Sequence, residues 1–102
     1  MKITITQEAG CARLHVDGDV DERGAEELKR RFRELNVASL AEAVFDFSNV
    51  GHIGSAGIGK LLLFYKDMAV GGGKIRIENL NEAVYDLFAL LKLETIFTLS
   101  KA

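Results

Sequence analysis

The 102-residue sequence predicts a single α/β domain, in which a mixed β-sheet built in the order β-β-α-β-α-β-α-β carries helices mainly on one face. Three patterns support this class: apolar residues alternate near the N-terminus, recur every three or four residues in three later segments, and form short runs between those segments. Hydrophobic residues make up 48% of the chain, enough apolar content for one compact core. We therefore expect one domain over residues 1–102.

A β-hairpin is predicted at the N-terminus. Ile3 and Ile5 alternate with polar neighbours before a turn at Glu8–Gly10, and the same alternation continues over residues 12–16. This period of two is typical of antiparallel strands with one face in water.

An amphipathic helix is predicted next, over about residues 22–36. Its apolar residues recur at spacings of three and four, and charged residues fill most of the other positions. Asp21 or Asp19 can cap its start. The apolar positions are Ala25, Leu28, Phe32 and Leu35.

The following elements are a central strand and a long helix. Residues 43–47 form a short apolar run, as expected of a strand buried on both faces. A loop then leads to Ser55, which we expect at the N-cap of a second helix that ends at Gly71–Gly73. The apolar stripe of that helix is predicted to comprise Ile58, Leu61, Leu62, Tyr65 and Met68.

The remaining pattern predicts a strand, a third helix and a last strand. Ile75 and Ile77 mark the strand, Asn81 caps the helix, and Thr95–Leu99 can form the final strand. Right-handed crossovers place consecutive helices on the same face of the sheet. The apolar stripe of the third helix is Val84, Leu87, Phe88 and Leu91. The predicted core comprises Val44, Phe45, Phe47, Leu61, Leu62, Ile75, Ile77, Leu87 and Phe88.

Charge and cysteine content argue against several function classes. Lys and Arg number 13 and Asp and Glu 15, so the net charge of -2 provides no positive field, and we expect no nucleic-acid binding. Cys11 is the only cysteine, and with His15 and His52 it shows no metal-ligand spacing. No stretch has the pattern of a signal peptide or a membrane span. We expect a cytoplasmic protein with no metal, no other cofactor and no membrane insertion.

Two patterns near Ser55 have the outline of catalytic motifs but lack essential residues. Gly54–Lys60 fits the phosphate-binding pattern G-x-x-x-x-G-K, but Leu61 stands where a magnesium-binding Ser or Thr is required. The hydrolase elbow G-x-S-x-G requires glycine at Ile53, and its histidine should follow the serine, whereas both histidines precede it. We therefore expect no enzymatic activity.

Ser55 stands out because Gly54, Gly57 and Gly59 surround it. Glycine inside a helix costs about 1 kcal/mol relative to alanine, a cost that a simple cap does not require. We interpret these glycines as leaving the serine hydroxyl and nearby backbone N–H groups accessible to a partner. A phosphate on Ser55 would meet the positive end of the helix dipole. A plain helix cap is the alternative interpretation.

Four motifs are spaced along the chain in the predicted order of elements. They are Gly18–Asp21, Val44–Ser48, Ser55–Gly59 and Gly72–Gly73. Together they resemble the STAS domain, and in particular the single-domain bacterial anti-sigma factor antagonists. The resemblance covers essentially the whole chain.

This resemblance implies a phosphorylation switch. In the family, the serine that directly follows an aspartate at the helix start is phosphorylated by a partner kinase that doubles as an anti-sigma factor, and a PP2C-type phosphatase is the implied reversing enzyme. The serine corresponds to Ser55 here. Gly54 replaces the preceding aspartate and Ala56 replaces a second hydroxyl residue, so a carboxylate contact to the kinase is lost.

The implied function is therefore regulatory protein binding in a partner-switching system. The family's acidic pair corresponds to Asp19 and Asp21, and its strand-end aspartate to Asp46. A STAS subunit that braces a lipid-transport ATPase complex, without a phosphorylation cycle, is the alternative. The oligomeric state stays open. The expected partner-binding residues are Asp19, Asp21, Gly54, Ser55, Ala56, Gly57, Ile58 and Gly59.

Overall fold

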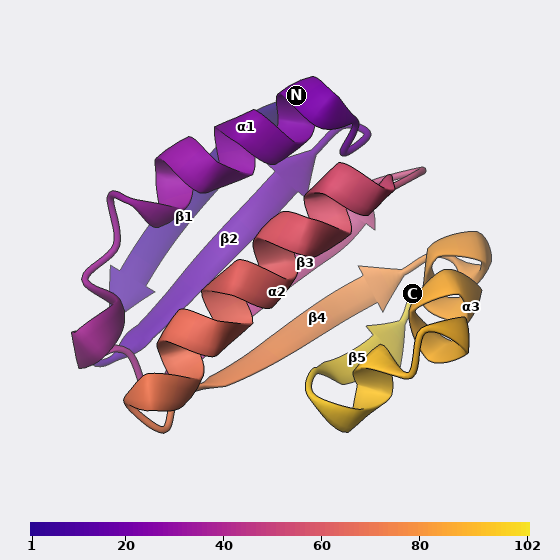
Figure 1. The fold of residues 1–102 in the computed structure, drawn as a ribbon. Coiled ribbons are helices and arrows are strands. Elements are labelled where there is room, and N and C mark those ends of the chain that lie inside the picture. The colour runs from indigo at the N-terminus through magenta and orange to yellow at the C-terminus, as the bar shows by residue number, and fades with distance from the viewer.

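The computed structural model describes all 102 residues, and its elements follow the predicted order (Figure 1). Two short 3-10 turns, Val37–Ser39 and Leu93–Thr95, lie between them. The strands and helices are β1 (Lys2–Glu8), β2 (Cys11–Asp17), α1 (Glu22–Phe32), β3 (Glu42–Asn49), α2 (Ser55–Val70), β4 (Lys74–Leu80), α3 (Glu82–Leu90) and β5 (Thr98–Lys101).

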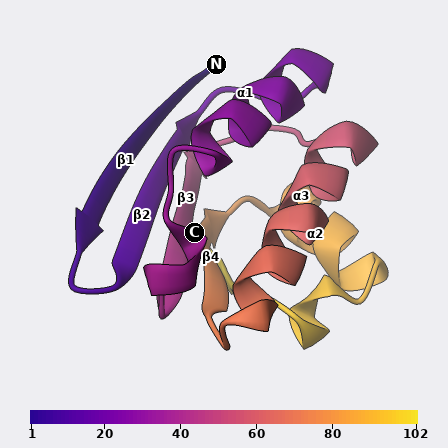
Figure 2. The same ribbon diagram turned by 60° about the vertical axis from the view of Figure 1, so that its left-hand side comes forward.

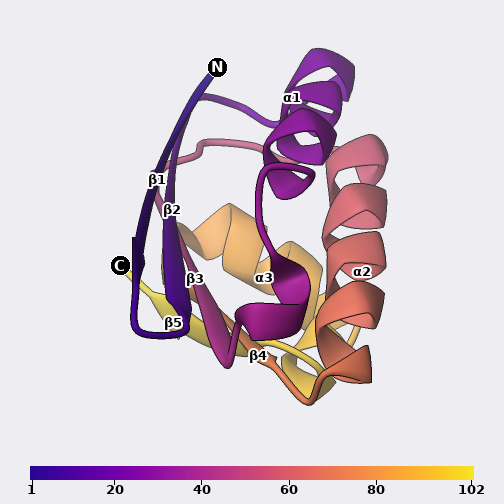
Figure 3. The ribbon, with the colours of Figure 1, turned by 90° about the vertical axis from the view of Figure 1, so that its left-hand side faces the viewer.

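The five strands form one mixed sheet in the order β1-β2-β3-β4-β5, so β3 is the central strand as predicted. β1 and β2 are antiparallel, and all other neighbours run parallel. The helices lie on one face of this sheet, as Figures 2 and 3 show from two directions. The predicted fold class is confirmed.

A two-residue turn closes the β1–β2 hairpin. Ala9 and Gly10 both have positive φ, of 43° and 82°, and Glu8 pairs directly with Cys11. Positive φ at both central residues matches the right-handed twist of the strands on either side. The predicted hairpin and its turn are therefore confirmed.

Aromatic side chains fill much of the layer between the helices and the sheet. Phe32 of α1 stacks on Phe64 of α2 with ring centroids 4.2 Å apart, and Phe45 of β3 meets both edge-on at 5.9 and 5.8 Å. Such pairs contribute roughly 0.5–1.5 kcal/mol each beyond the area they bury. They fix α1 and α2 against the central strand and hence position the loop that precedes α2.

Three leucines of the predicted stripes are less buried than expected. Leu62 is 38% exposed and Leu91 48% exposed, while Leu87 is half-buried against the core. In α2, Phe64 is buried in place of Leu62. Apolar residues occupy four consecutive positions there, so periodicity alone does not determine which of them face the sheet.

Two element boundaries also differ from the sequence prediction. α1 ends at Phe32 and not at residue 36, although Leu35 beyond it is still buried through a turn. The last strand is Thr98–Lys101, because a 3-10 turn that follows the left-handed Lys92 occupies Leu93–Thr95.

No helix covers the second face of the sheet, so the expectation that β3 is buried on both faces holds only in part: Asp46 is half-buried and Ser48 exposed on that face. Val44 is nonetheless buried on that face, where it pairs in register with Arg13 and Arg76. Long charged side chains can cover an apolar neighbour with their aliphatic stems while the charge stays in water.

Candidate functional site

Ser55 is the first residue of α2, and Gly54 is the N-cap. Gly54 has extended backbone angles (φ -92°, ψ 176°), and its carbonyl accepts the N–H of Ile58 at 3.1 Å. The prediction that Ser55 is the N-cap is therefore wrong by one position. No side chain caps this helix, and the Ser55 side chain is exposed and makes no hydrogen bond to the protein. Its hydroxyl is free to react or to bind.

The backbone around Val20 holds the loop before Ser55 in place. The Val20 N–H donates to the carbonyl of His52, and the Gly54 N–H donates to the carbonyl of Val20, both at 2.9 Å. Val20 and Ile53 form an isolated parallel bridge, and both are buried. The β2–α1 connection and the β3–α2 loop therefore form one unit.

The two predicted acidic residues have different structural tasks. Asp19 accepts hydrogen bonds from the backbone N–H groups of Gly51 and His52, each at 3.1 Å, through the same oxygen Oδ1. Asp21 caps α1 by accepting the N–H of Gly24 at 2.8 Å. Both aspartates are exposed, so each presents a carboxylate at the surface as well.

Asn81 anchors the same loop from the opposite side, a role that the sequence analysis missed. Its Nδ2 donates to the carbonyls of Val50 and Gly51, both at 3.2 Å. Its Oδ1 accepts the N–H of Val84 at 2.7 Å and so caps α3, as predicted. One amide side chain thus joins the start of α3 to the loop that leads to Ser55.

Two of the glycines around Ser55, Gly57 and Gly59, have different surroundings. A Cβ added at Gly57 would lie 2.6 Å from Val20 Cγ1 and 2.9 Å from Ile53 Cγ1, so this glycine permits close packing. A Cβ at Gly59 would meet nothing within 4 Å. The interpretation that the glycines provide exposure therefore does not hold for Gly57, which is buried together with Ile58.

A shallow groove of about 410 Å³ lies between the start of α1 and the first turns of α2. Two glutamates of α1 form one side, and Lys60 forms an ion pair of 3.9 Å across it with Glu26. The groove places small residues of α2 beside an acidic helix start. Its lining residues are Glu22, Ala25, Glu26, Ala56, Gly59, Lys60 and Leu63.

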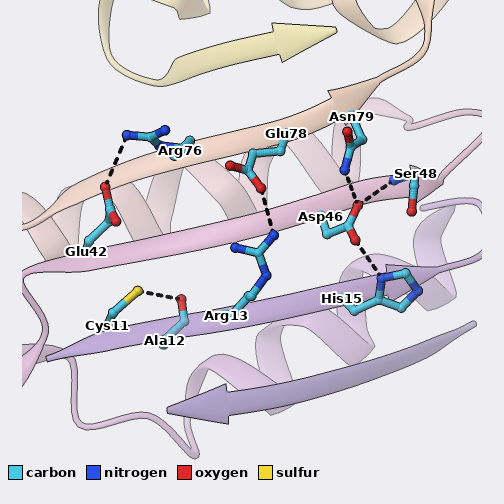
Figure 4. A network of polar contacts seen from close by, with 10 residues as sticks. All are labelled: Cys11, Ala12, Arg13, His15, Glu42, Asp46, Ser48, Arg76, Glu78 and Asn79. Atoms are coloured by element: carbon cyan, nitrogen blue, oxygen red, sulfur yellow. Dashed lines mark hydrogen bonds and ion pairs between the residues drawn. The ribbon is translucent and has the colours of Figure 1, made fainter. Parts of the chain in front are cut away.

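Asp46 lies on the helix-free face of the sheet, with the helices behind the strands (Figure 4). Its carboxylate accepts hydrogen bonds of 3.0 Å from the ring Nδ1 of His15, from Asn79 Nδ2 and from the backbone N–H of Ser48. Burial raises the pKa of the Asp46 carboxyl, but these hydrogen bonds outweigh it and hold that pKa well below its usual range. The structure therefore separates Asp46 from the other predicted acidic residues.

The structure also shows where the residues of the two incomplete catalytic motifs lie. Leu61, at the magnesium position of the phosphate-loop pattern, is fully buried in the core. His52 contacts Asp19 through its backbone, and its side chain makes no hydrogen bond to Ser55. No three His, Cys, Asp or Glu side chains are grouped so that they could hold a metal ion. None of the helices combines the length and the hydropathy of a membrane span.

Comparison with known proteins identifies relatives of this fold. A family model described as "STAS domain" matches residues 2–102. An anti-sigma factor antagonist from Mycobacterium paratuberculosis has a TM-score of 0.84 at 22% identity, covering 99% of this chain and 86% of that one. The Thermotoga maritima protein TM1081 has a TM-score of 0.87 at 19% identity, covering 98% and 86%.

The anti-sigma factor antagonist SpoIIAA is similar to this chain in an unphosphorylated and a phosphorylated form. Its unphosphorylated form has a TM-score of 0.78 at 12% identity, covering 99% of this chain and 89% of that one. Its phosphorylated form, from Bacillus, has a TM-score of 0.76 at 12% identity, covering 96% and 90%. At these identities the likeness concerns the fold.

Proposed function

The chain belongs to the STAS domain family, and from this premise we propose that it is an anti-sigma factor antagonist of a partner-switching system. In this role it binds an anti-sigma factor that is also a serine kinase, and that kinase phosphorylates Ser55. Phosphorylation releases the partner, and a PP2C-type phosphatase in the same cytoplasm restores binding. The chain itself performs no catalysis.

One observation carries this proposal: an exposed, unbonded serine hydroxyl stands at the start of a 16-residue helix on an anchored loop. The backbone N–H groups of the first helical turn have no side-chain cap. A kinase can therefore reach Ser55 Oγ. The hydroxyl gives its proton to a base of the kinase and bonds to the γ-phosphorus of ATP, while the bond from that phosphorus to the β,γ-bridging oxygen breaks and ADP leaves. The resulting phosphate lies at the positive end of the helix dipole, which stabilises it by about 0.3–1 kcal/mol.

The surroundings of Ser55 explain how a phosphate would disrupt a complex. Asp19 and Asp21 are exposed on the connection that holds the Ser55 loop, and Glu22 and Glu26 line the neighbouring groove. Phosphorylation adds about -1.5 to -2 charges to this acidic surface. Desolvating that charge inside an interface, with the repulsion from the carboxylates, would cost roughly 2–4 kcal/mol, or about 30- to 1000-fold in affinity.

The partner surface follows from which predicted residues are accessible. Asp19, Asp21, Ser55 and Ala56 are exposed, and Gly54 and Gly59 are half-buried. Gly57 and Ile58 support this surface from beneath. Because Gly54 carries no carboxylate, recognition of the kinase depends on the Asp19–Asp21 side of the site, which suits a basic patch on the partner.

Phosphorylation of the purified chain by the co-purifying kinase, read by intact mass and peptide mass spectrometry, tests this function. We expect one phosphate on Ser55, none on the Ser55→Ala variant, and normal phosphorylation of Ser100→Ala, which removes an exposed serine in β5. Phosphate elsewhere, or none at all, would contradict the proposal. A stable complex with a lipid-transport ATPase that Ser55→Asp leaves intact would instead indicate the bracing role.

A further inference from the structure

β1 is an open edge of the sheet. It pairs only with β2, runs for seven residues without a register shift, and contains no proline, since the chain has none. The other edge, β5, is only four residues long. Long, regular edge strands present unpaired backbone groups that another strand can bind, and proteins usually protect them with proline, bulges, short length or charged side chains. The charged residues of β1 are confined to its two ends, Lys2 and Glu8.

The hairpin register shows which backbone groups of β1 point outward. The two-residue turn makes Glu8 and Cys11 a hydrogen-bonded pair, and such pairs alternate along an antiparallel ladder. Thr4 and Thr6 therefore bond to β2, whereas Ile3, Ile5 and Gln7 direct their N–H and C=O groups away from it. No loop or cap elsewhere in the chain supplies a backbone partner for these groups.

We propose that β1 pairs antiparallel with β1 of a second copy of this chain, with the two-fold axis through Ile5. In this register Ile5 faces Ile5 of the copy, and Ile3 faces Gln7. The outward backbone groups of both strands then oppose each other and form a continuous ladder. The result is one ten-stranded sheet, since each copy contributes five strands.

The charges of β1 are self-complementary in this register. Lys2 lies opposite Glu8 of the copy at both ends of the pairing, and neither residue has an ion-pair partner within its own chain. Shifting the register by one pair in either direction places Lys2 opposite Thr6, or Glu8 opposite Thr4, and leaves the remaining charges unmatched. Charge complementarity therefore selects both the occupant and the register.

The helix side of the sheet is also compatible with this pairing. Ile5 is only partly buried against the core, so the same residue of the copy would cover its exposed part. A two-fold axis perpendicular to the sheet places all helices on one face and makes the two copies of α1 antiparallel. α1 begins with Glu22 and ends with Lys29, Arg30 and Arg31, so the two antiparallel copies of α1 would have opposite charges at their facing ends, although Arg30 and Arg31 already pair with Glu27 and Glu34 of their own chain.

Sedimentation velocity over protein concentrations up to about 1 mM tests the proposal. We expect a concentration-dependent monomer–dimer equilibrium for the wild type. Lys2→Glu places Glu opposite Glu8 at both ends, and Glu8→Lys places Lys opposite Lys2. Each change replaces two attractions by two repulsions, which should weaken the homodimer about 10- to 100-fold.

Mixing the two variants provides the decisive measurement. In a dimer of Lys2→Glu with Glu8→Lys, both ends again pair opposite charges, so the mixture should dimerise although each variant alone does not. Lys66→Glu and Glu94→Lys, which reverse exposed charges away from β1, should dimerise as the wild type does. A monomeric wild type at the highest concentration, a monomeric mixture, or unaffected single variants would each overturn the proposal. Association of a foreign peptide with a monomeric wild type would make the edge a partner-binding strand instead.

Discussion

The Cγ1 atom of Val20 lies directly beside Gly57, so that a Cβ at this glycine would lie 2.6 Å from it. Val20 belongs to the connection between β2 and α1, and Gly57 to the first turn of α2. This contact brings the acidic connection and the serine-bearing helix start to one surface. The proposed site therefore depends on one glycine as much as on its polar residues.

Gly57→Ala should accordingly destabilise the fold. The added methyl group also lies 2.9 Å from Ile53 Cγ1, so two buried side chains must move. Overpacking of this kind costs about 1–3 kcal/mol, partly offset by the higher helix propensity of alanine. Urea unfolding measures the change in the free energy of unfolding.

Gly59→Ala is the matched control, because nothing lies within 4 Å of its Cβ position, and it should stabilise the protein by up to about 1 kcal/mol. Equal effects of the two substitutions would contradict the packing role.

Asn81→Asp should separate the two tasks of this side chain. An aspartate keeps an oxygen to cap α3 and suits the helix dipole, but it loses the donor to the carbonyls of Val50 and Gly51. We expect the free energy of unfolding to fall by about 0.5–1.5 kcal/mol while the loop loosens, because the second carboxylate oxygen faces two carbonyl oxygens that have lost their donor. Amide hydrogen exchange should then accelerate at Gly51 and His52.

Asn81→Ala is the comparison, because it removes the cap as well. It should lower the free energy of unfolding by about 0.5–2 kcal/mol in addition to loosening the loop. Unchanged exchange of the Gly51 and His52 amides in both variants would show that Asp19 alone holds this loop.

Asp46 should contribute to stability at neutral pH and lose that contribution in acid. Its pKa is lower in the folded state than in the unfolded chain, so the unfolded chain binds more protons and stability rises with pH. Asp46→Asn should lower the free energy of unfolding by about 1–3 kcal/mol at pH 7. The difference from wild type should shrink as the pH falls below about 5, where unfolded aspartate begins to take up protons.

Unfolding curves at a series of pH values measure this difference. Asp67→Asn, which changes an exposed carboxylate of α2 without an ion pair, is the control and should show little effect at any pH. A wild-type advantage over Asp46→Asn that stays constant down to pH 3 would contradict the assignment.

The sequence was sufficient to predict local elements and less informative where several chain segments meet. Alternation identified the hairpin, and Asn81 was recognised as the cap of α3 because Asn followed by an apolar stripe is a local signal. The other hydrogen bonds of Asn81, from Nδ2 to the carbonyls of Val50 and Gly51, reach residues 31 and 30 positions earlier in the chain. No local sequence pattern predicts them. The prediction that Leu62 is buried is wrong for a related reason. Residues Leu61–Phe64 are all apolar, so only packing against the sheet determines which of their side chains are buried.

The candidate site shows the same division. The glycine neighbours of Ser55 and the family resemblance predict it as the regulatory residue, and the structure places it exposed at the start of α2. The interpretation that Gly57 provides exposure is wrong. The side chain that leaves no room for a Cβ there belongs to Val20, which is distant in the sequence. The position of Asp46 on the helix-free face follows from strand alternation with Phe45 and Phe47, which are buried toward the helices.

Ser55→Asp should separate folding from partner binding. The carboxylate lies at the first position of α2, where the helix dipole favours negative charge by about 0.3–1 kcal/mol, and no buried neighbour is displaced because Ser55 is exposed. The free energy of unfolding should therefore stay equal to that of wild type or rise slightly. Affinity for the kinase should nevertheless fall, because the new charge joins an acidic surface that the partner must cover.

Ser55→Asn is the matched control, since it has nearly the same size as aspartate without the charge. Isothermal titration calorimetry with the co-purified kinase should give an affinity for Ser55→Asn within a few fold of wild type, against a loss of about 10-fold or more for Ser55→Asp. Equal losses would mean that side-chain size and not charge controls the interface. Full affinity of Ser55→Asp in a normally folded protein would remove the electrostatic basis of the switch, because a phosphate acts through the same repulsion at the same atom.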